Sequence, residues 1–181
     1  MSIESLAREA GVGAGTVSQY ERGMGNPTIA TLRRLAAVLG IPLIALAGND
    51  ETAAEPAPPR DTQANFRPGH VGVVRAAQRR RLVLPGVGPE YDILTPDLHG
   101  ALVMMQSVFH VGFDNLDDRF SHEGEEVVTL VTGRVEARIG DDTMILEAGD
   151  SVTFDASLPH GWRTLGSDDA SFYAAITPPT M

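Results

Sequence analysis

Residues 49–65 constrain the fold more than any other segment of this 181-residue chain, because they divide it in two. This stretch holds three prolines and almost no large apolar residue, a composition that forms linkers rather than cores. Apolar residues before it recur with the period of a helix, whereas those after it alternate with the period of a strand. The sequence therefore predicts two domains, residues 1–48 and 66–181, joined by a linker.

Charge is distributed unequally between these parts. All 14 basic residues are arginine, and the formal net charge is −10. Residues 1–50 are neutral, but residues 82–181 contain four arginines and 17 acidic residues. Such an acidic chain argues against non-specific nucleic-acid binding by the whole molecule, and the imbalance indicates two domains with different partners.

Composition also excludes several classes of protein. Cysteine is absent, so disulfides, thiol catalysis and cysteine-built zinc sites are excluded. No apolar run approaches the ~18–20 residues that span a bilayer. Met1 is followed at once by Ser2-Ile3-Glu4, without the basic and apolar regions of a signal peptide. We therefore expect a cytoplasmic protein with no membrane partner.

The first domain has the pattern of short helices. One apolar face with helical spacing follows Ser2, a suitable N-cap: Ile3, Leu6, Ala7 and Ala10. We expect a second helix over about residues 14–21, a third with Asn26 as its N-cap and Pro27 at its first helical position that ends at Gly40, and a short fourth from Pro42. The buried stripe of the third helix is predicted to be Ile29, Leu32, Leu35, Ala36 and Leu39.

Ala7, Gly11 and Val17 have the spacing of a helix-turn-helix. A small residue lets the helices cross closely, glycine tolerates the positive φ of the turn, and a branched residue fills the crossing. An ordinary helical hairpin would also use glycine in its turn, so this spacing alone leaves both interpretations open. The wider segment, residues 2–12, 16–23, 26–28 and 35–40, closely resembles the DNA-binding domain of Xre-type (lambda-repressor-like) regulators.

This resemblance implies that residues 14–22 form a recognition helix in the major groove of double-stranded DNA. The positions that face base edges in the family are Ala14, Gly15, Ser18 and Gln19, and Gln19 can pair bidentately with adenine. Phosphate contacts are expected from Ser2, Thr16, Arg22 and Asn26. The alternative for each of these residues is an ordinary solvated helix surface.

The resemblance also implies a five-helix domain, whose first helix would precede Met1. Gly13 replaces the usual Ser or Thr cap, and Gly15 lies within the recognition helix, where it costs about 1 kcal/mol relative to alanine. An all-α domain that lacks one wall would be less stable. One alternative is therefore an orphan sensor whose truncated first domain does not bind DNA.

The second domain has the pattern of many short strands. Val127-Thr129-Val131 and Val135-Ala137-Ile139 alternate with other residues, and turn signals such as Thr132-Gly133 recur at short spacing. This pattern is typical of an antiparallel sandwich or barrel. His122, Glu126-x6-Gly133 and Gly149-x10-His160 resemble the two motifs of the cupin family. That resemblance covers residues 66–181 and implies an all-β jelly-roll barrel.

In cupins the two motifs place three histidines and one glutamate around a metal. Here Phe120 stands at the first histidine, which leaves His122, Glu126 and His160. Two imidazoles and one carboxylate suffice for a divalent metal such as Zn, Fe, Ni or Mn. The alternative is that these residues hydrogen-bond inside the barrel or contact a ligand directly. We expect them to line the ligand pocket together with Phe120 and Trp162.

An Xre-type domain, a linker and a cupin together resemble a known architecture of bacterial regulators, the putrescine-utilisation repressor group. This likeness implies a non-enzymatic transcriptional regulator that binds operator DNA as a homodimer and a small-molecule effector in its cupin. The acidic second domain would favour a cationic effector such as a polyamine. Residues 71–74 are a candidate strand for exchange between subunits. The catalytic alternative is a cupin metalloenzyme of dioxygenase or isomerase type.

Overall fold

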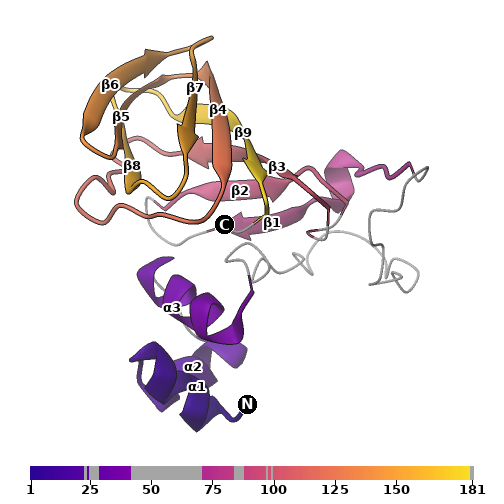
Figure 1. Cartoon of the computed structure of the whole chain (residues 1–181). Helices are drawn as coiled ribbons and strands as arrows, with labels where there is room; N and C mark the ends of the chain where they lie inside the picture. The colour runs from indigo at the N-terminus through magenta and orange to yellow at the C-terminus, as the bar shows by residue number, and fades with distance from the viewer. Residues whose placement is uncertain are drawn as a thin grey trace.

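The computed structural model describes residues 1–22, 24, 29–41, 71–83, 88–96, 98 and 100–179. Helices come first along the chain and strands follow them (Figure 1). The described helices of the first domain are α1 (Ile3–Ala10), α2 (Ala14–Glu21) and α3 (Ile29–Leu39). The predicted Asn26-Pro27 cap, the fourth helix from Pro42 and the linker at 49–65 lie outside the described residues.

The ends of α1 follow from its sequence. The Ser2 side-chain oxygen accepts a hydrogen bond from the Ser5 backbone N–H at 3.2 Å, as expected of an N-cap. Gly11 ends the helix at φ +64°, and its N–H bonds back to the carbonyls of Ala7 and Arg8. Ala7 and Val17 are both buried where the helices cross. The helix-turn-helix spacing is therefore confirmed.

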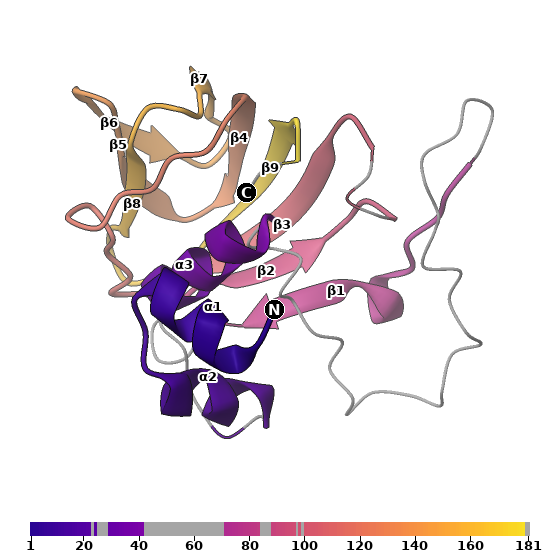
Figure 2. The same ribbon diagram turned by 60° about the horizontal axis from the view of Figure 1, so that its bottom comes forward.

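The buried stripe of α3 differs in part from the prediction. Leu35 and Ala36 are buried, and Leu35 packs with α1 and α2. Leu39 is 41% exposed, because the helix turns Val38 toward α1 and α2 instead. Leu32 packs against the core of the second domain. The two sides of α3 therefore contact different domains, and Figures 1 and 2 both show α3 as the helix nearest the strands.

The second domain is a sandwich of two antiparallel sheets. A 3-10 helix (Ala76–Gln78) precedes the described strands: β1 (Arg80–Val83), β2 (Glu90–Ile93), β3 (Val103–Phe109), β4 (Glu125–Thr132), β5 (Arg134–Ile139), β6 (Asp142–Glu147), β7 (Ser151–Asp155), β8 (His160–Thr164) and β9 (Ala170–Thr177). Six strands form one sheet in the order β1-β2-β3-β9-β4-β7, and three form the other in the order β6-β5-β8. Apolar side chains from both sheets form one core between them. The predicted all-β jelly roll is confirmed.

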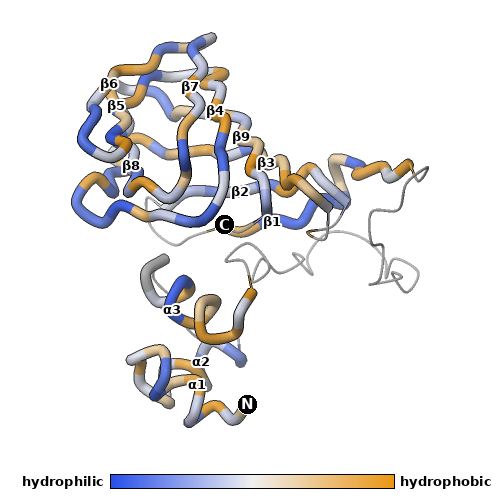
Figure 3. The backbone as a smooth tube through the Cα atoms, viewed as in Figure 1, coloured by the Kyte–Doolittle hydropathy of each residue, from blue (hydrophilic) through white to orange (hydrophobic). Residues whose placement is uncertain are grey.

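Strand β4 points a different set of residues inward than the sequence pattern suggested. Val135, Ala137 and Ile139 of β5 are buried as predicted. On β4, however, the buried set is Glu126, Val128 and Leu130, and Val131 is 45% exposed. In Figure 3 the lower end of β4 is hydrophilic, and apolar residues predominate above it. This phase places the Glu126 carboxylate on the inner face of the sandwich.

Residues 71–75 form no strand in this chain and precede the 3-10 helix. Val71 and Val73 are 84% and 63% exposed. Exchange of this segment between subunits stays a prediction. Among the described residues, no helix is long and apolar enough to cross a membrane.

Candidate functional sites

One face of helix α2 is exposed to solvent. Val17 points into the helical core, whereas Ala14, Gly15 and Gln19 are exposed. Thr16 and Ser18 on the same helix are half-buried. The four predicted base-facing positions therefore all lie on α2, and three of them are exposed.

The other predicted DNA contacts have internal partners as well. Ser2 is exposed but its hydroxyl oxygen already caps α1. Arg22 is exposed, and its Nε donates to the Ser18 carbonyl at 3.0 Å. Asn26 lies outside the described residues. Gly13 is the N-cap of α2 and makes no side-chain cap bond, as its lack of a side chain requires.

A short antiparallel pairing builds the site in the second domain. The backbone N–H of Phe120 donates to the His160 carbonyl at 3.0 Å, and the His160 N–H donates to the Phe120 carbonyl at 2.7 Å. Two residues later, the His122 N–H donates to the Ala156 carbonyl at 2.9 Å. Gly124 then turns the chain into β4 at φ +104°, where a Cβ would collide with the backbone of Thr177. This turn brings His122 and Glu126 against His160.

The three predicted ligands come together. Nε2 of His122 lies 3.2 Å from Oε2 of Glu126, and Nε2 of His160 lies 3.7 Å from the same oxygen. Their candidate ligand atoms all lie within 4.8 Å of one another. The side chains of His122 and Glu126 are each 7% exposed, and that of His160 is fully buried. The carboxylate is therefore shared between two imidazoles in a nearly dry site.

His160 is oriented as metal-binding histidines usually are. Its Nδ1 lies 2.8 Å from the Leu158 carbonyl, which can only accept, so Nδ1 carries the proton and Nε2 offers a lone pair. Burial lowers the pKa of His160, although the Leu158 carbonyl and Glu126 act in the opposite direction. Nε2 is buried and has no hydrogen-bond partner in the described part of the chain. An orphaned nitrogen beside a carboxylate and a second imidazole fits a divalent cation.

Phe120 occupies the remaining side of this cluster. Its ring makes an edge contact with His160, with centroids 4.4 Å apart. A phenyl ring offers no lone pair, so at most three protein ligands come from the described cluster. Positions for water or a small ligand would remain open at a metal held there.

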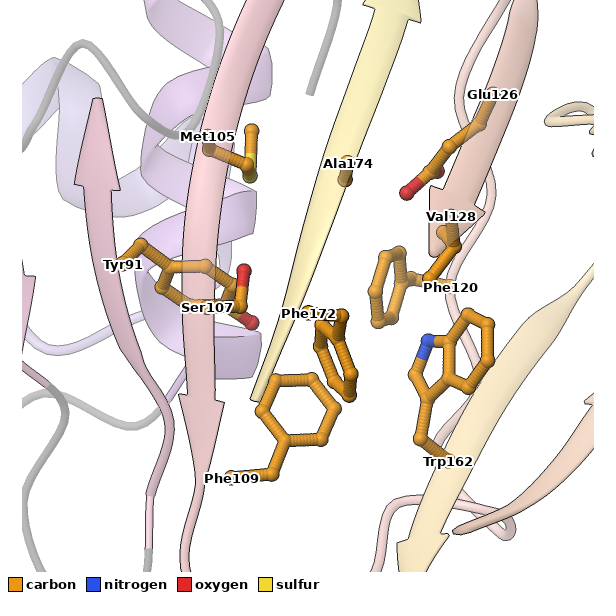
Figure 4. A pocket seen from close by; sticks show the side chains of 10 residues that line it. All are labelled: Tyr91, Met105, Ser107, Phe109, Phe120, Glu126, Val128, Trp162, Phe172 and Ala174. Atoms are coloured by element: carbon orange, nitrogen blue, oxygen red, sulfur yellow. The ribbon is translucent and has the colours of Figure 1, made fainter. Parts of the chain in front are cut away.

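A cavity lies beside the cluster, inside the sandwich (Figure 4). Its space free of atoms is about 280 Å³, counting the solvent at its opening. Three predicted pocket residues line it, namely Phe120, Glu126 and Trp162, while His122 and His160 lie next to it in the cluster. The other lining residues are Tyr91, Met105, Ser107, Phe109, Val128, Phe172 and Ala174. The wall is thus mostly apolar and aromatic, with one carboxylate.

The additional lining residues were not predicted. Their signal is the alternation along β3, where Met105, Ser107 and Phe109 occupy every second position and are buried. Such alternation identifies an inner face but not a cavity.

Burial raises the pKa of Tyr91, so its phenol is neutral at ordinary pH and can donate or accept a hydrogen bond.

Comparison with known proteins agrees with this two-domain description. Residues 1–46 match the helix-turn-helix family model, and residues 110–176 match that of the cupin domain. The chain is 24% identical over 181 residues to the HTH-type transcriptional regulator PuuR of Escherichia coli (strain K12), covering all of this chain and 89% of that protein. It is 23% identical over 180 residues to the regulator SutR of the same organism, covering 98% and 87%.

Solved structures show the same fold. An HTH_3 family transcriptional regulator from Vibrio cholerae superposes with a TM-score of 0.62 at 19% identity, over 98% of this chain and 86% of that one. Hydroxypropylphosphonic acid epoxidase from S. wedmorenis superposes with a TM-score of 0.51 at 25% identity, over 97% and 89%. From its domains and relatives together, the chain is an Xre-type helix-turn-helix protein with a C-terminal cupin domain, homologous to the transcriptional regulators PuuR and SutR.

Proposed function

We propose that this protein binds operator DNA through α2 and binds a small-molecule effector in its cupin domain. The observation that carries the proposal is the presence of a DNA-binding surface and a ligand pocket in one chain. An exposed helix-turn-helix surface lies in the first domain, and a partly open pocket with a polar cluster lies in the second. Full-length similarity to named transcriptional regulators supports this assignment.

In the DNA-binding role, the exposed face of α2 enters the major groove. Gln19 supplies directional hydrogen bonds, whereas Ala14 and Gly15 supply only shape and close approach. Two such helices in a homodimer would read half-sites about 34 Å apart. Sequence preference would therefore rest on few side chains and partly on DNA shape.

Selection of genomic DNA fragments by the purified full chain tests this role. We expect the recovered fragments to share one motif with two-fold symmetry, located upstream of a small number of genes. The variant Gln19→Ala should recover that motif less efficiently, because the adenine contact is lost. Gln78→Ala is the matched control, since Gln78 is exposed in the 3-10 helix of the other domain. Fragments without a shared motif would contradict the proposal.

For the effector, the pocket favours a small cation with apolar segments. Glu126 is the acidic group among aromatic walls that include Phe120 and Trp162. Aromatic faces and a carboxylate together stabilise an ammonium group. The acidic surface of the domain would raise the local concentration of such a ligand.

Calorimetric titration with a diamine such as putrescine tests this ligand class. We expect heat from the wild-type chain and a loss of at least about tenfold in affinity for Glu126→Gln, because one charged hydrogen bond is removed. Glu147→Gln is the control, since Glu147 is an exposed acid on β6. Absence of heat from the wild type would count against a cationic effector.

We propose a divalent metal as the alternative occupant of His122, Glu126 and His160, because a metal bound to Glu126 would take up the negative charge that a cationic effector needs. The buried, unpartnered Nε2 of His160 is the observation behind this assignment. A metal there would supply a Lewis-acidic position at the pocket wall, and the protein side chains would fix its place. Zn, Fe, Ni and Mn all accept such a donor set.

Metal content after loading and desalting tests the assignment. We expect about one metal ion per chain for the wild type and less than about a tenth of that for His160→Ala, because one of three ligands is lost. His110→Ala is the matched control, since His110 lies outside the cluster. Equal loading of wild type and His160→Ala would overturn the metal site.

Catalysis is a second candidate, favoured by one structural neighbour. The Fe(II) form of hydroxypropylphosphonic acid epoxidase (HppE) superposes at a TM-score of 0.52 and 26% identity over 97% of this chain, so the likeness extends across both domains. Against this candidate, none of the described residues that line the cavity is basic; Arg33 contacts the Phe120 ring but is not itself a lining residue. Oxygen uptake by the Fe(II)-loaded chain with hydroxypropylphosphonic acid discriminates between the two. Regulation predicts no substrate-dependent uptake.

A further inference from the structure

One helix of the DNA-binding domain contacts a residue that lines the cupin pocket. Helix α3 packs Leu35 against α1 and α2, while Leu32, one turn earlier, packs against the cupin core. Arg33 follows Leu32 and extends over the ring of Phe120, with its guanidinium carbon 4.1 Å from the ring centroid. Phe120 is itself a lining residue of the pocket. A single side chain of the first domain therefore packs against one residue of the wall of the second domain's cavity.

The surroundings of Arg33 are unusual for an arginine. Within the described part of the chain, its guanidinium lies against an aromatic ring and has no carboxylate at ion-pair distance. Burial lowers the pKa of Arg33, and the nearby Tyr91 and Asp118 act in the opposite direction. The positive charge of the same guanidinium contributes to lowering the pKa of His160 in the polar cluster. The charge is thus partly desolvated and held mainly by a π face, a weaker partner than a carboxylate.

We propose that Arg33 is an intramolecular latch that docks α3 on the cupin domain and closes the pocket at Phe120. The helix that carries the latch also supports the recognition helix, because Leu35 of α3 and Val17 of α2 share one core. Release of Arg33 would therefore free the helix-turn-helix as a unit.

The latch suggests how an effector would act, and this consequence rests on the proposed function. A cation placed between Phe120 and Glu126 would compete for the same ring and repel the guanidinium. A cation bound in the pocket would displace the Arg33 side chain, and α3 would transmit this displacement to α2. The latch itself needs neither effector nor DNA, so its test is independent of the proposed function.

Distance measurements between two spin labels test the docking. The chain has no cysteine, so Glu4→Cys on α1 and Asp141→Cys in the β5–β6 turn give two unique exposed sites in the full chain. Dilution with unlabelled protein removes distances between subunits. We expect one narrow distribution for the otherwise wild-type chain and a broad one after Arg33→Ala. Arg34→Ala is the control, because Arg34 bonds to the Gly11 carbonyl within the first domain.

A broad distribution without Arg33→Ala, or the same distribution with and without it, would overturn the latch. Broadening by Arg34→Ala to the same extent would also overturn it, because the effect would then come from general loosening of α3. Phe120→Leu should broaden the distribution as Arg33→Ala does, since leucine keeps the apolar volume but removes the π face.

Quenching of Trp162 gives a second, independent measurement of pocket closure. Trp162 is the chain's single tryptophan, lines the pocket and is 3% exposed. We expect Arg33→Ala to raise the acrylamide Stern–Volmer constant at least about twofold, because the pocket opens more often to solvent. Arg34→Ala should leave the constant unchanged. An unchanged constant for Arg33→Ala would contradict closure of the pocket by this residue.

Discussion

His160 shows how one residue can combine a structural and a chemical role. Its backbone pairs with Phe120, its Nδ1 bonds to the Leu158 carbonyl, and its Nε2 remains for a ligand. Each of these contacts lies within a few residues of the motif that first indicated the site. The donor set was predicted from a resemblance, whereas the orientation of the ring required the three-dimensional structure.

Phe120 gives a direct prediction at this scale. Replacement by histidine would add an imidazole next to His160, whose ring centroid lies 4.4 Å from that of Phe120. We expect Phe120→His to tighten metal binding at least about tenfold, since a fourth protein ligand is added. Competition with a chelator of known affinity measures this change. Phe120→Leu is the size control, and equal affinities for histidine and leucine would argue against a metal at this cluster.

The residues predicted to face DNA, and Arg33, mark the limit of residue-level prediction. Positions 14, 15, 18 and 19 could be named because the segment resembles Xre-type domains, in which these positions face base edges, and the structure places all four on α2. Arg33 gave no such signal, because its partner Phe120 is 87 positions away in the sequence and in another domain. Contacts between domains depend on packing that local patterns do not encode.

At the level of elements, the helices were easier to predict than the phase of the strands. The bounds of α2 match the expected residues 14–21, since Gly11 and Gly13 interrupt the helical pattern before it. On β4, apolar residues occupy both faces, at Val127 and Val131 as well as Val128 and Leu130. Alternation therefore could not decide which set points inward. Pairing with both β7 and β9 decides it in the folded protein.

The weak point of α2 leads to a prediction about its stability. Gly15 is exposed within the helix, and a Cβ added there would have nothing within 4 Å. We expect Gly15→Ala to raise the free energy of unfolding of the first domain by up to about 1 kcal/mol, through lower backbone entropy in the unfolded chain. Denaturation followed by helical circular dichroism measures it. A destabilising effect would show that the residue is not in a regular helix.

A cluster of charges at the edge of the sandwich predicts a pH dependence. Nδ1 of His110 lies 3.0 Å from Asp169, and Nε2 lies 3.3 Å from Glu90, which also faces Arg81 at 4.0 Å. The hydrogen bond that His110 donates to Asp169, with a further one to Glu90, raises the pKa of His110. The folded state therefore holds the proton more tightly than the unfolded chain, whose histidines have a pKa of about 6.5.

This contribution to stability is present in full below the pKa that His110 has in the unfolded chain. It is lost as the pH rises through the higher pKa that His110 has in the folded protein. We expect His110→Gln to lower the melting temperature by about 1–3 °C at pH 6 and by less at pH 9, because the pair is partly exposed. Asp169→Asn should show the same pattern. An equal loss at both pH values would indicate packing rather than charge.

Across the whole molecule, the division of charge separates the two roles. The acidic cupin domain would repel DNA outside the operator, so α2 and its neighbours alone would contact the duplex. The two-domain layout followed from the composition of residues 49–65 and from the change in apolar period. Docking of the domains through α3 did not, because it depends on Leu32 and Arg33 at a single surface.

Binding of the full chain to DNA from upstream of its own gene tests the central claim most directly. Fluorescence anisotropy would compare wild type, Gln19→Ala and the Gln78→Ala control in the same buffer and salt. We predict saturable binding by wild type and control, and about tenfold or greater weakening by Gln19→Ala, as one lost bidentate base contact requires. Absence of binding by the wild type, or equal affinity of Gln19→Ala, would contradict operator recognition by α2.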